Sequence, residues 1–127
     1  MSDSVKFFVY GTLKEGGHFA KHFDSARLSS KPARISGFDL YSLGPFPAIC
    51  DGTGEVVGEL HTYSHGDEII RQFDRIEGYR EGSSSNLYNR RKVSVTLDDG
   101  TTDEAFIYVF GGEITGQKKI ESGVWEL

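Results

Sequence analysis

One segment of the chain, residues 64–77, has clear helical periodicity, and it lies between runs that are typical of strands. Its apolar residues recur at the spacing of one helix face: Ile69, Ile70, Phe73 and Ile76. Ser64 is a candidate N-cap, Asp67 follows in a position similar to that of a capping box, and Gly78 ends the segment. Because strands and helices do not alternate regularly, the sequence favours an α+β fold.

Five runs rich in β-branched and aromatic residues predict strands, and they cover residues 5–10, 34–43, 55–63, 88–97 and 102–110. Asp-Gly-Thr-Gly at residues 51–54 predicts a turn before the third strand, and Asp-Asp-Gly at residues 98–100 predicts a hairpin between the last two. Pro45 and Pro47 end the second strand, because proline cannot donate to a ladder. We therefore expect a curled, mostly antiparallel sheet, or a small open barrel, wrapped against the helix at residues 64–77. Residues 18–26 indicate a second, weaker helix.

Composition limits what holds this fold together and what it can bind. With 127 residues, 37% of them hydrophobic, and a net charge of −5, the chain predicts one domain over residues 1–127 and argues against nucleic acid binding. The single Cys50 cannot form an intrachain disulfide, and His18 and His22 lack a third ligand, so no metal is predicted. No run approaches the ~18 apolar residues that cross a bilayer. We expect a cytoplasmic protein, and these features do not fix its oligomeric state.

The loop that leaves the first strand, residues 10–17, is the first candidate for a functional site. It reads Tyr-Gly-Thr-Leu-Lys-Glu-Gly-Gly, and glycine-punctuated loops of this kind expose successive backbone N–H groups. Such amides suit a carboxylate, a phosphate or a developing oxyanion. The loop lacks the Gly-x4-Gly-Lys-Ser/Thr pattern of a P-loop. The alternative is that its glycines only turn the chain.

Glu77 is the second candidate, because it shares the helix face that its neighbours should bury. Helical spacing aligns it with Phe73 and Ile70. Desolvation, the negative end of the helix dipole and the nearby Asp74 all disfavour its charged form, which is the situation that suits a carboxyl to general acid–base catalysis. The alternative is that Glu77 turns outward and pairs with a neighbouring arginine.

Residues 37–49 combine aromatic residues, small residues and the two prolines, so they could form a rigid wall beside the first loop. Ordinary packing between a strand and a loop explains them equally well. Cys50 follows directly and is expected to pack as a small hydrophobe. As a nucleophile it would need His61 or His65 as its base.

Several motifs, taken in order along the chain, resemble those of the gamma-glutamyl cyclotransferase-like superfamily. They include Tyr-Gly-Thr-Leu-Lys-x-Gly after the first strand, Gly-Glu-Leu before the helix and Asp-x-x-Glu-Gly-Tyr at the helix end, where that family has its catalytic glutamate. The similar segments are residues 10–16, 37–49, 58–60, 74–79, 88–95 and 105–108. Together they extend from residue 5 to about residue 110.

The resemblance implies a small, mostly antiparallel β-barrel with flanking helices, closed or nearly closed, and a cavity where the first loop meets the glutamate. It also implies a reaction, in which the α-amine of a gamma-glutamyl group attacks its own side-chain amide carbonyl. The products are 5-oxoproline and the released amine, and no cofactor is required. The resemblance assigns the proton transfer to Glu77 as general base and then general acid.

The same resemblance assigns substrate binding to the first loop. Backbone amides of Gly11, Thr12 and Leu13 would hold the substrate carboxylate or the oxyanion. Tyr10 would position the glutamyl group of a small-molecule substrate. The leaving amine stays open between a dipeptide, a lysine isopeptide, an alkylamine and an antibiotic precursor. Two alternatives to the enzyme are a non-catalytic small-ligand-binding module on the same fold and an amide hydrolase that releases free glutamate.

Overall fold

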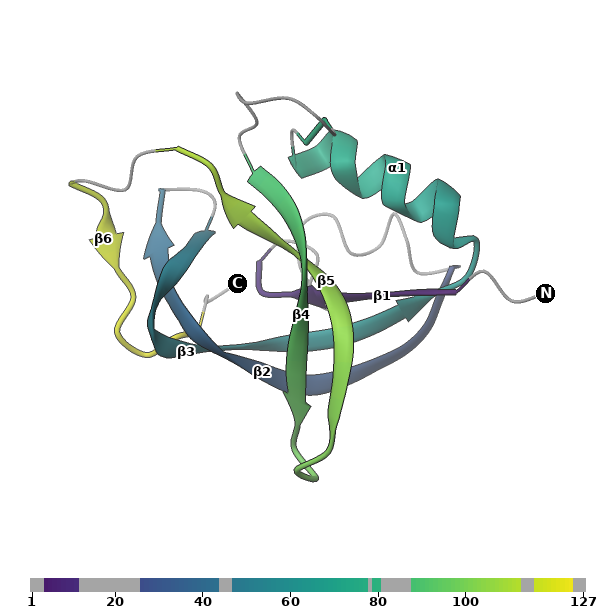
Figure 1. Cartoon of the computed structure of the whole chain (residues 1–127), viewed down its shortest axis with the longest axis horizontal. Helices are drawn as coiled ribbons and strands as arrows, with labels where there is room; N and C mark the ends of the chain where they lie inside the picture. The colour runs from purple at the N-terminus through teal and green to yellow at the C-terminus, as the bar shows by residue number, and fades with distance from the viewer. Residues whose placement is uncertain are drawn as a thin grey trace.

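Five strands close into a barrel in this protein, seen in the computed structural model of Figure 1, which describes residues 4–11, 26–43, 47–77, 79–80, 88–112 and 116–124. The strands are β1 (Val5–Val9), β2 (Arg27–Ser42), β3 (Pro47–Tyr63), β4 (Tyr88–Leu97), β5 (Thr102–Phe110) and the short β6 (Lys118–Lys119). Their order is β3-β1-β5-β4-β2-β6, and a further pairing of β2 with β3 completes the ring. β1 and β5 are parallel, and the other pairs are antiparallel. The predicted α+β barrel is confirmed, and the weaker of its predicted helices, at residues 18–26, lies outside the described residues except for Ala26.

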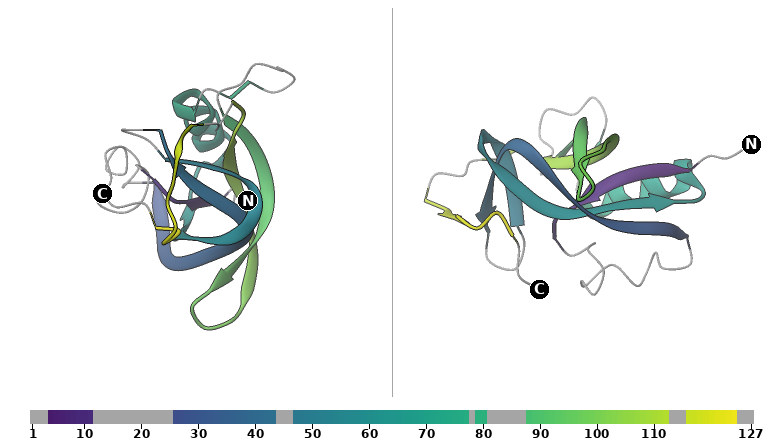
Figure 2. Two further views of the ribbon diagram at one scale, coloured as in Figure 1. Left: turned by 90° about the vertical axis from the view of Figure 1, so that its left-hand side faces the viewer. Right: turned by 90° about the horizontal axis from the view of Figure 1, so that it is seen from below.

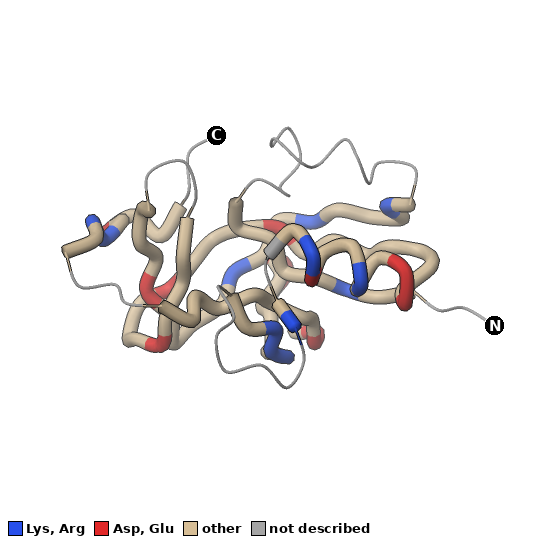
Figure 3. Tube along the Cα trace, turned by 90° about the horizontal axis from the view of Figure 1, so that it is seen from above, with Lys and Arg blue, Asp and Glu red and all other residues tan. Residues whose placement is uncertain are grey.

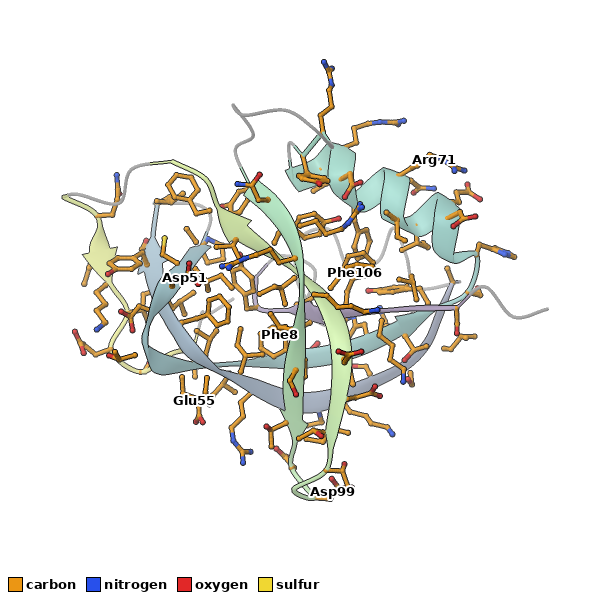
Figure 4. All side chains as sticks on the ribbon, viewed as in Figure 1. Phe8, Asp51, Glu55, Arg71, Asp99 and Phe106 are labelled. Carbon is orange, nitrogen blue, oxygen red and sulfur yellow. The ribbon has the colours of Figure 1, made fainter. Side chains whose placement is uncertain are left out.

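One helix, α1 (Gly66–Glu77), lies against the outside of this barrel over β1 (Figures 1 and 2). Its apolar face supplies Ile69 and Phe73, which are 4% and 0% exposed. The centre of the Phe73 ring lies 4.6 Å from the centre of the Phe7 ring of β1 and 5.2 Å from that of the Tyr63 ring of β3. Arg71 points away from the barrel (Figure 4). The predicted amphipathic helix is therefore confirmed, with its apolar stripe facing the sheet.

The start of α1 differs from the prediction. The His65 carbonyl accepts the first helical hydrogen bond, from the Ile69 amide at 3.0 Å, so His65 is the N-cap residue. The Ser64 hydroxyl donates instead to the Ala26 carbonyl at 3.2 Å. The prediction that Ser64 caps the helix is wrong, because its hydroxyl bonds to Ala26, which lies 38 positions earlier and directly before β2.

The buried side chains form two cores on opposite sides of the barrel wall. The first fills the barrel interior and includes Phe8, Ile35, Leu40 and Ile107. The left view in Figure 2 shows the strands curving round this interior. The second core lies between the barrel and α1 and includes Phe7, Tyr63, Phe73 and Tyr108. Successive residues of β1 alternate between the two cores, as the period of a strand requires.

Residues 52–54 form a bulge inside β3, so the predicted turn between two strands at residues 51–54 is wrong. Ser36 pairs with Glu55, and the next pair is Phe38 with Asp51, so three residues of β3 oppose the single Gly37 of β2. Gly37 has a φ of +86°, a conformation that favours glycine. The bulge bends the hairpin without ending it (Figure 1). β2 also begins at Arg27 rather than at residue 34, because residues 27–33 pair with β3 as well.

The C-terminal half follows the predictions more closely. β4 and β5 form the expected hairpin, in which the Gly100 amide donates to the Leu97 carbonyl at 2.9 Å and Gly100 has a φ of +87°. The tail packs back on the body, since the Ile120 amide donates to the Leu40 carbonyl at 2.7 Å. In the described ranges, no helix is long and apolar enough to cross a membrane. Figure 3 shows acidic and basic residues distributed along α1, with Asp67 and Glu68 in its first turn and Arg75 in its last.

Candidate functional site

The first candidate loop leaves the end of β1, where Tyr10 and Gly11 are buried. A side chain at Gly11 would meet Pro47, because an ideal Cβ there would lie 2.6 Å from the Pro47 Cγ and 3.1 Å from its Cδ. Glycine is therefore required for this close approach. The contact brings the first loop beside the proline segment. Thr12 and Leu13, predicted to bind substrate, lie outside the described residues.

Pro47 is also the point where a third segment joins. The Tyr88 hydroxyl, at the start of β4, donates to the Pro47 carbonyl at 2.6 Å. The Tyr88 ring packs edge-on against Phe110 at the end of β5. Residues distant in sequence thus meet at one end of the barrel. Pro47 is the first residue of β3, a position where a strand tolerates proline.

Tyr10 has a buried hydroxyl with a defined partner. This hydroxyl donates to the Tyr108 carbonyl of β5 at 2.6 Å, and the side chain belongs to the core inside the barrel. The hydrogen bond reinforces the parallel pairing of β1 with β5. It fixes the residue from which the first loop departs.

The second candidate, Glu77, is the last residue of α1, and its side chain lies outside the described part of the structure. The helix positions that the sequence aligned with it face the barrel: Phe73 is fully buried, and Ile70 packs at the edge of the same core. Beyond the helix, the Tyr79 amide donates to the Asp74 carbonyl at 2.8 Å. This six-residue closure is one of the ways in which helices end.

Asp74 ties this last turn of α1 to two strands. Its Oδ1 accepts a hydrogen bond from the Tyr108 hydroxyl of β5 at 2.7 Å, and its Oδ2 accepts one from the Arg90 guanidinium of β4. The side chains of Asp74 and Arg90 are 20% and 17% exposed. Burial alone would lower the pKa of Arg90, but the hydrogen bond and charge of Asp74 outweigh it and the pKa is raised. Arg90 therefore keeps its positive charge at neutral pH.

Arg90 also stacks on aromatic rings from both sides of this junction. Its guanidinium carbon lies 5.0 Å from the centre of the Tyr79 ring and 5.3 Å from that of Phe106. Figure 4 shows Phe106 on the side of the barrel that faces the helix. These are favourable cation–π distances. Arg90 thus holds together β4, β5 and the segment that follows α1.

Sequence reasoning treated Asp74 as a charge that acts on Glu77, and the structure gives it a different setting. Its charge is balanced by Arg90. Its bond to Tyr108 joins residues 34 positions apart, so no local pattern indicates it. The one available signal was that Asp74, Arg90 and Tyr108 all belong to the family-like segments.

Cys50 and His61 do not form a nucleophile and base. Burial, followed by the charges of Asp51 and Asp39, raises the pKa of the Cys50 thiol, which disfavours the reactive thiolate. His61 is fully buried and bonded elsewhere, with Nδ1 2.7 Å from the Tyr63 hydroxyl and Nε2 2.8 Å from Glu59 Oε1. In the described segments, no three His, Cys, Asp or Glu side chains gather as metal ligands.

Fold and geometry together define a class of protein: a small closed barrel with one helix against its wall, and a strand–loop junction and helix end joined through β5. The family model described as "Gamma-glutamyl cyclotransferase, AIG2-like" matches residues 7–127. The chain belongs to this family.

Relatives with curated names agree with this assignment. The chain is 32% identical over 104 residues to the gamma-L-glutamyl-butirosin B gamma-glutamyl cyclotransferase of Niallia circulans, covering 81% of this chain and 65% of that protein. It thus spans about two thirds of that relative's length. It is 27% identical over 121 residues to the gamma-glutamylcyclotransferase family protein YtfP of Escherichia coli K12, covering 95% and 96% of the two chains.

Solved structures show the same fold. An AIG2-like protein from Mus musculus superposes with a TM-score of 0.72 at 21% identity, covering 97% of this chain and 88% of the other. At that identity the comparison supports the fold alone. The closed barrel with its helix is therefore shared with the AIG2-like proteins.

Proposed function

We propose that this protein is a cofactor-independent gamma-glutamyl cyclotransferase acting on a small gamma-glutamyl amide or amine conjugate. The proposal is carried by the family match over residues 7–127. In the reaction, the substrate α-amine forms a bond to its own δ-carbonyl carbon, and the bond from that carbon to the leaving amine breaks. The products are 5-oxoproline and the free amine.

Glu77 serves as the proton carrier in this mechanism. As a carboxylate it takes the proton from the attacking α-ammonium group, and as a carboxylic acid it returns that proton to the leaving amine. The position of Glu77 at the end of α1 supports this role, because Asp74, one turn earlier, holds the helix end against the barrel. A carboxyl group at a fixed position is what general acid–base catalysis needs.

The first loop binds the substrate in the same proposal. Amides of Gly11, Thr12 and Leu13 receive the substrate carboxylate or the oxyanion of the intermediate. Close packing of Gly11 on Pro47 supports a preorganised loop. Tyr10 positions the glutamyl group by fixing the start of this loop, since its hydroxyl is bonded to the Tyr108 carbonyl. A single domain over residues 1–127 and a cytoplasmic location remain predictions from the sequence.

Product analysis tests this function. Purified protein is incubated with gamma-glutamyl amines, gamma-glutamyl dipeptides, glutathione, gamma-glutamyl-ε-lysine and the gamma-glutamyl-butirosin B of the relative's name, and products are identified by mass spectrometry. We expect 5-oxoproline from at least one compound. Glu77→Gln keeps the side-chain shape without the proton carrier and should lower turnover by roughly 10²- to 10⁴-fold.

Glu68→Gln is the matched control, because it makes the same change on the exposed first turn of the same helix. It should retain full turnover. Free glutamate in place of 5-oxoproline would indicate a hydrolase. Absence of any product, together with thermal stabilisation by one of the compounds, would support the binding module.

A further inference from the structure

Tyr108 joins the two halves of the candidate site through different atoms. Its backbone carbonyl accepts the hydrogen bond from Tyr10, at the start of the first loop, at 2.6 Å. Its side-chain hydroxyl donates to Asp74, in the last turn of α1, at 2.7 Å. Both bonds are made by one residue of β5. The start of the first loop and the last turn of α1 are therefore held by the same residue of the barrel.

The Tyr108 side chain has little freedom to move. It is 4% exposed, and its ring stacks on the Phe7 ring of β1 at a centroid distance of 5.8 Å and an interplanar angle of 6°. A hydroxyl on a ring held in this way is a fixed donor. Asp74 is therefore held at a defined position relative to β1 and β5.

Asp74 carries this constraint into the helix. Its two carboxylate oxygens accept bonds from two strands, and its backbone carbonyl accepts the Tyr79 amide that closes the helix. Helix ends fray unless tertiary contacts hold them. With side chain and backbone both engaged, the last turn, which ends at Glu77, is fixed on the barrel.

We propose that Tyr108 and Asp74 are positioning residues, which set the location of the Glu77 backbone relative to the first loop. This inference rests on the proposed function, in which Glu77 and the loop amides act on one substrate. Neither positioning residue touches the substrate. The Tyr108 hydroxyl acts through Asp74 on the helix end, and the Tyr108 carbonyl acts through Tyr10 on the loop.

A substitution of the Tyr108 side chain can remove one of its two hydrogen bonds and keep the other. Tyr108→Phe removes the bond to Asp74 and leaves the ring and the backbone carbonyl that accepts from Tyr10. Loop and substrate binding should then survive while the proton carrier is displaced. Because a misplacement of about 1 Å can cost roughly 10²-fold in rate, we expect kcat to fall by about 10- to 100-fold with KM changed by less than about 3-fold. Asp74→Asn should act in the same direction, because an uncharged amide pairs poorly with Arg90.

Tyr63→Phe is the matched control. This substitution also removes a buried hydroxyl beneath α1, from a ring that also packs on Phe73. The Tyr63 hydroxyl, however, lies 2.7 Å from Nδ1 of His61 in β3, whereas the Tyr108 hydroxyl donates to the helix. The three variants are compared with the wild type by steady-state kinetics on the turned-over substrate, well below each melting temperature. Hydrogen–deuterium exchange of the α1 amides is measured on the same samples.

The expected result is a loss of kcat and roughly tenfold faster exchange at residues 75–77 in Tyr108→Phe and Asp74→Asn, with the first turn of α1 unchanged. Tyr63→Phe should keep the wild-type kcat. Unchanged kcat or unchanged exchange in Tyr108→Phe would overturn the inference, as would an equal loss of kcat in Tyr63→Phe. If Glu77→Gln stays active or no substrate is turned over, the proposed function fails. The exchange rates of residues 75–77 in Tyr108→Phe still test whether Tyr108 and Asp74 anchor the helix end.

Discussion

Gly11 and Pro47 pack so closely that no side chain fits between them: an ideal Cβ on Gly11 would lie 2.6 Å from the Pro47 Cγ. Gly11 belongs to the first loop and Pro47 to the proline segment, two segments that the sequence indicates independently. Their contact places the start of the first loop against the start of β3.

This contact predicts a specific defect in Gly11→Ala. The added methyl group should displace the first loop, lower turnover and lower the free energy of unfolding by about 1–3 kcal/mol, as overpacking does. Urea denaturation followed by circular dichroism measures the stability. Pro47→Ala makes room at this position, so the double variant should recover part of the loss. Equal stability losses in Gly11→Ala with and without Pro47→Ala would show that the clash is not the cause.

The buried His61 predicts a loss of stability without a loss of catalysis. His61→Leu removes the bonds to Tyr63 and Glu59 from a fully buried position. We expect the free energy of unfolding to fall by about 1–3 kcal/mol, the usual cost of unsatisfied buried groups. In the double variant with Tyr63→Phe the losses should be less than additive. Additive losses in this cycle would rule out coupling between the two side chains.

The Lys6–Asp103 pair predicts a small dependence of stability on pH. The hydrogen bond from Lys6 Nζ, at 2.5 Å, is the main cause that lowers the pKa of Asp103. A lowered pKa in the folded state stabilises the protein above the unfolded value of about 3.9, and this stabilisation disappears as pH falls through the folded pKa. Lys6→Met should therefore destabilise at pH 7 by about 0.2–1 kcal/mol, since both side chains are more than one third exposed. Chemical denaturation at pH 7 and below pH 3 measures the free energy of unfolding of the wild type and of Lys6→Met. A difference between the two proteins that persists below pH 3 would contradict the pairing.

Cys50 predicts slow thiol chemistry. Burial is the largest cause that raises the pKa of the Cys50 thiol, and the charge of Asp51 raises it further. Alkylation by iodoacetamide at pH 8 should be slower than that of a free cysteine, because only the thiolate reacts. Asp51→Asn should accelerate it by removing a negative charge, whereas Asp98→Asn, the same change in the distant hairpin turn, should leave the rate unchanged. A wild-type rate in Asp51→Asn would show that the charge of Asp51 does not control the thiol.

Local chemistry explains which parts of the fold were predictable. The hairpin at residues 98–100 is predicted correctly, because adjacent residues specify its turn. The same kind of residues at 51–54 were misinterpreted, because turn chemistry shows that a chain bends and not whether pairing resumes afterwards. The Asp39 carboxylate, whose Oδ1 accepts from the Gly54 amide at 3.1 Å, comes from the opposite strand.

The candidate site divides in the same way. The glycine loop and the helix-end glutamate could be selected from the sequence, because spacing and family-like motifs mark them. The link between them could not, since it depends on where β5 lies in the ring. In the sequence, Tyr108 is one aromatic residue of a predicted strand and of a family-like segment, and neither feature indicates its hydrogen bonds to Tyr10 and Asp74.

Closure of the barrel has a consequence for when this protein acquires its site. The contacts between β1 and β5 join residues far apart in the sequence, 97 positions for Lys6 with Asp103 and 98 for Tyr10 with Tyr108. Contacts of such high sequence separation slow folding. On the ribosome, the first loop is made before its anchor on β5, which follows it by 98 positions. The proposed catalyst therefore forms only after β5 has been made.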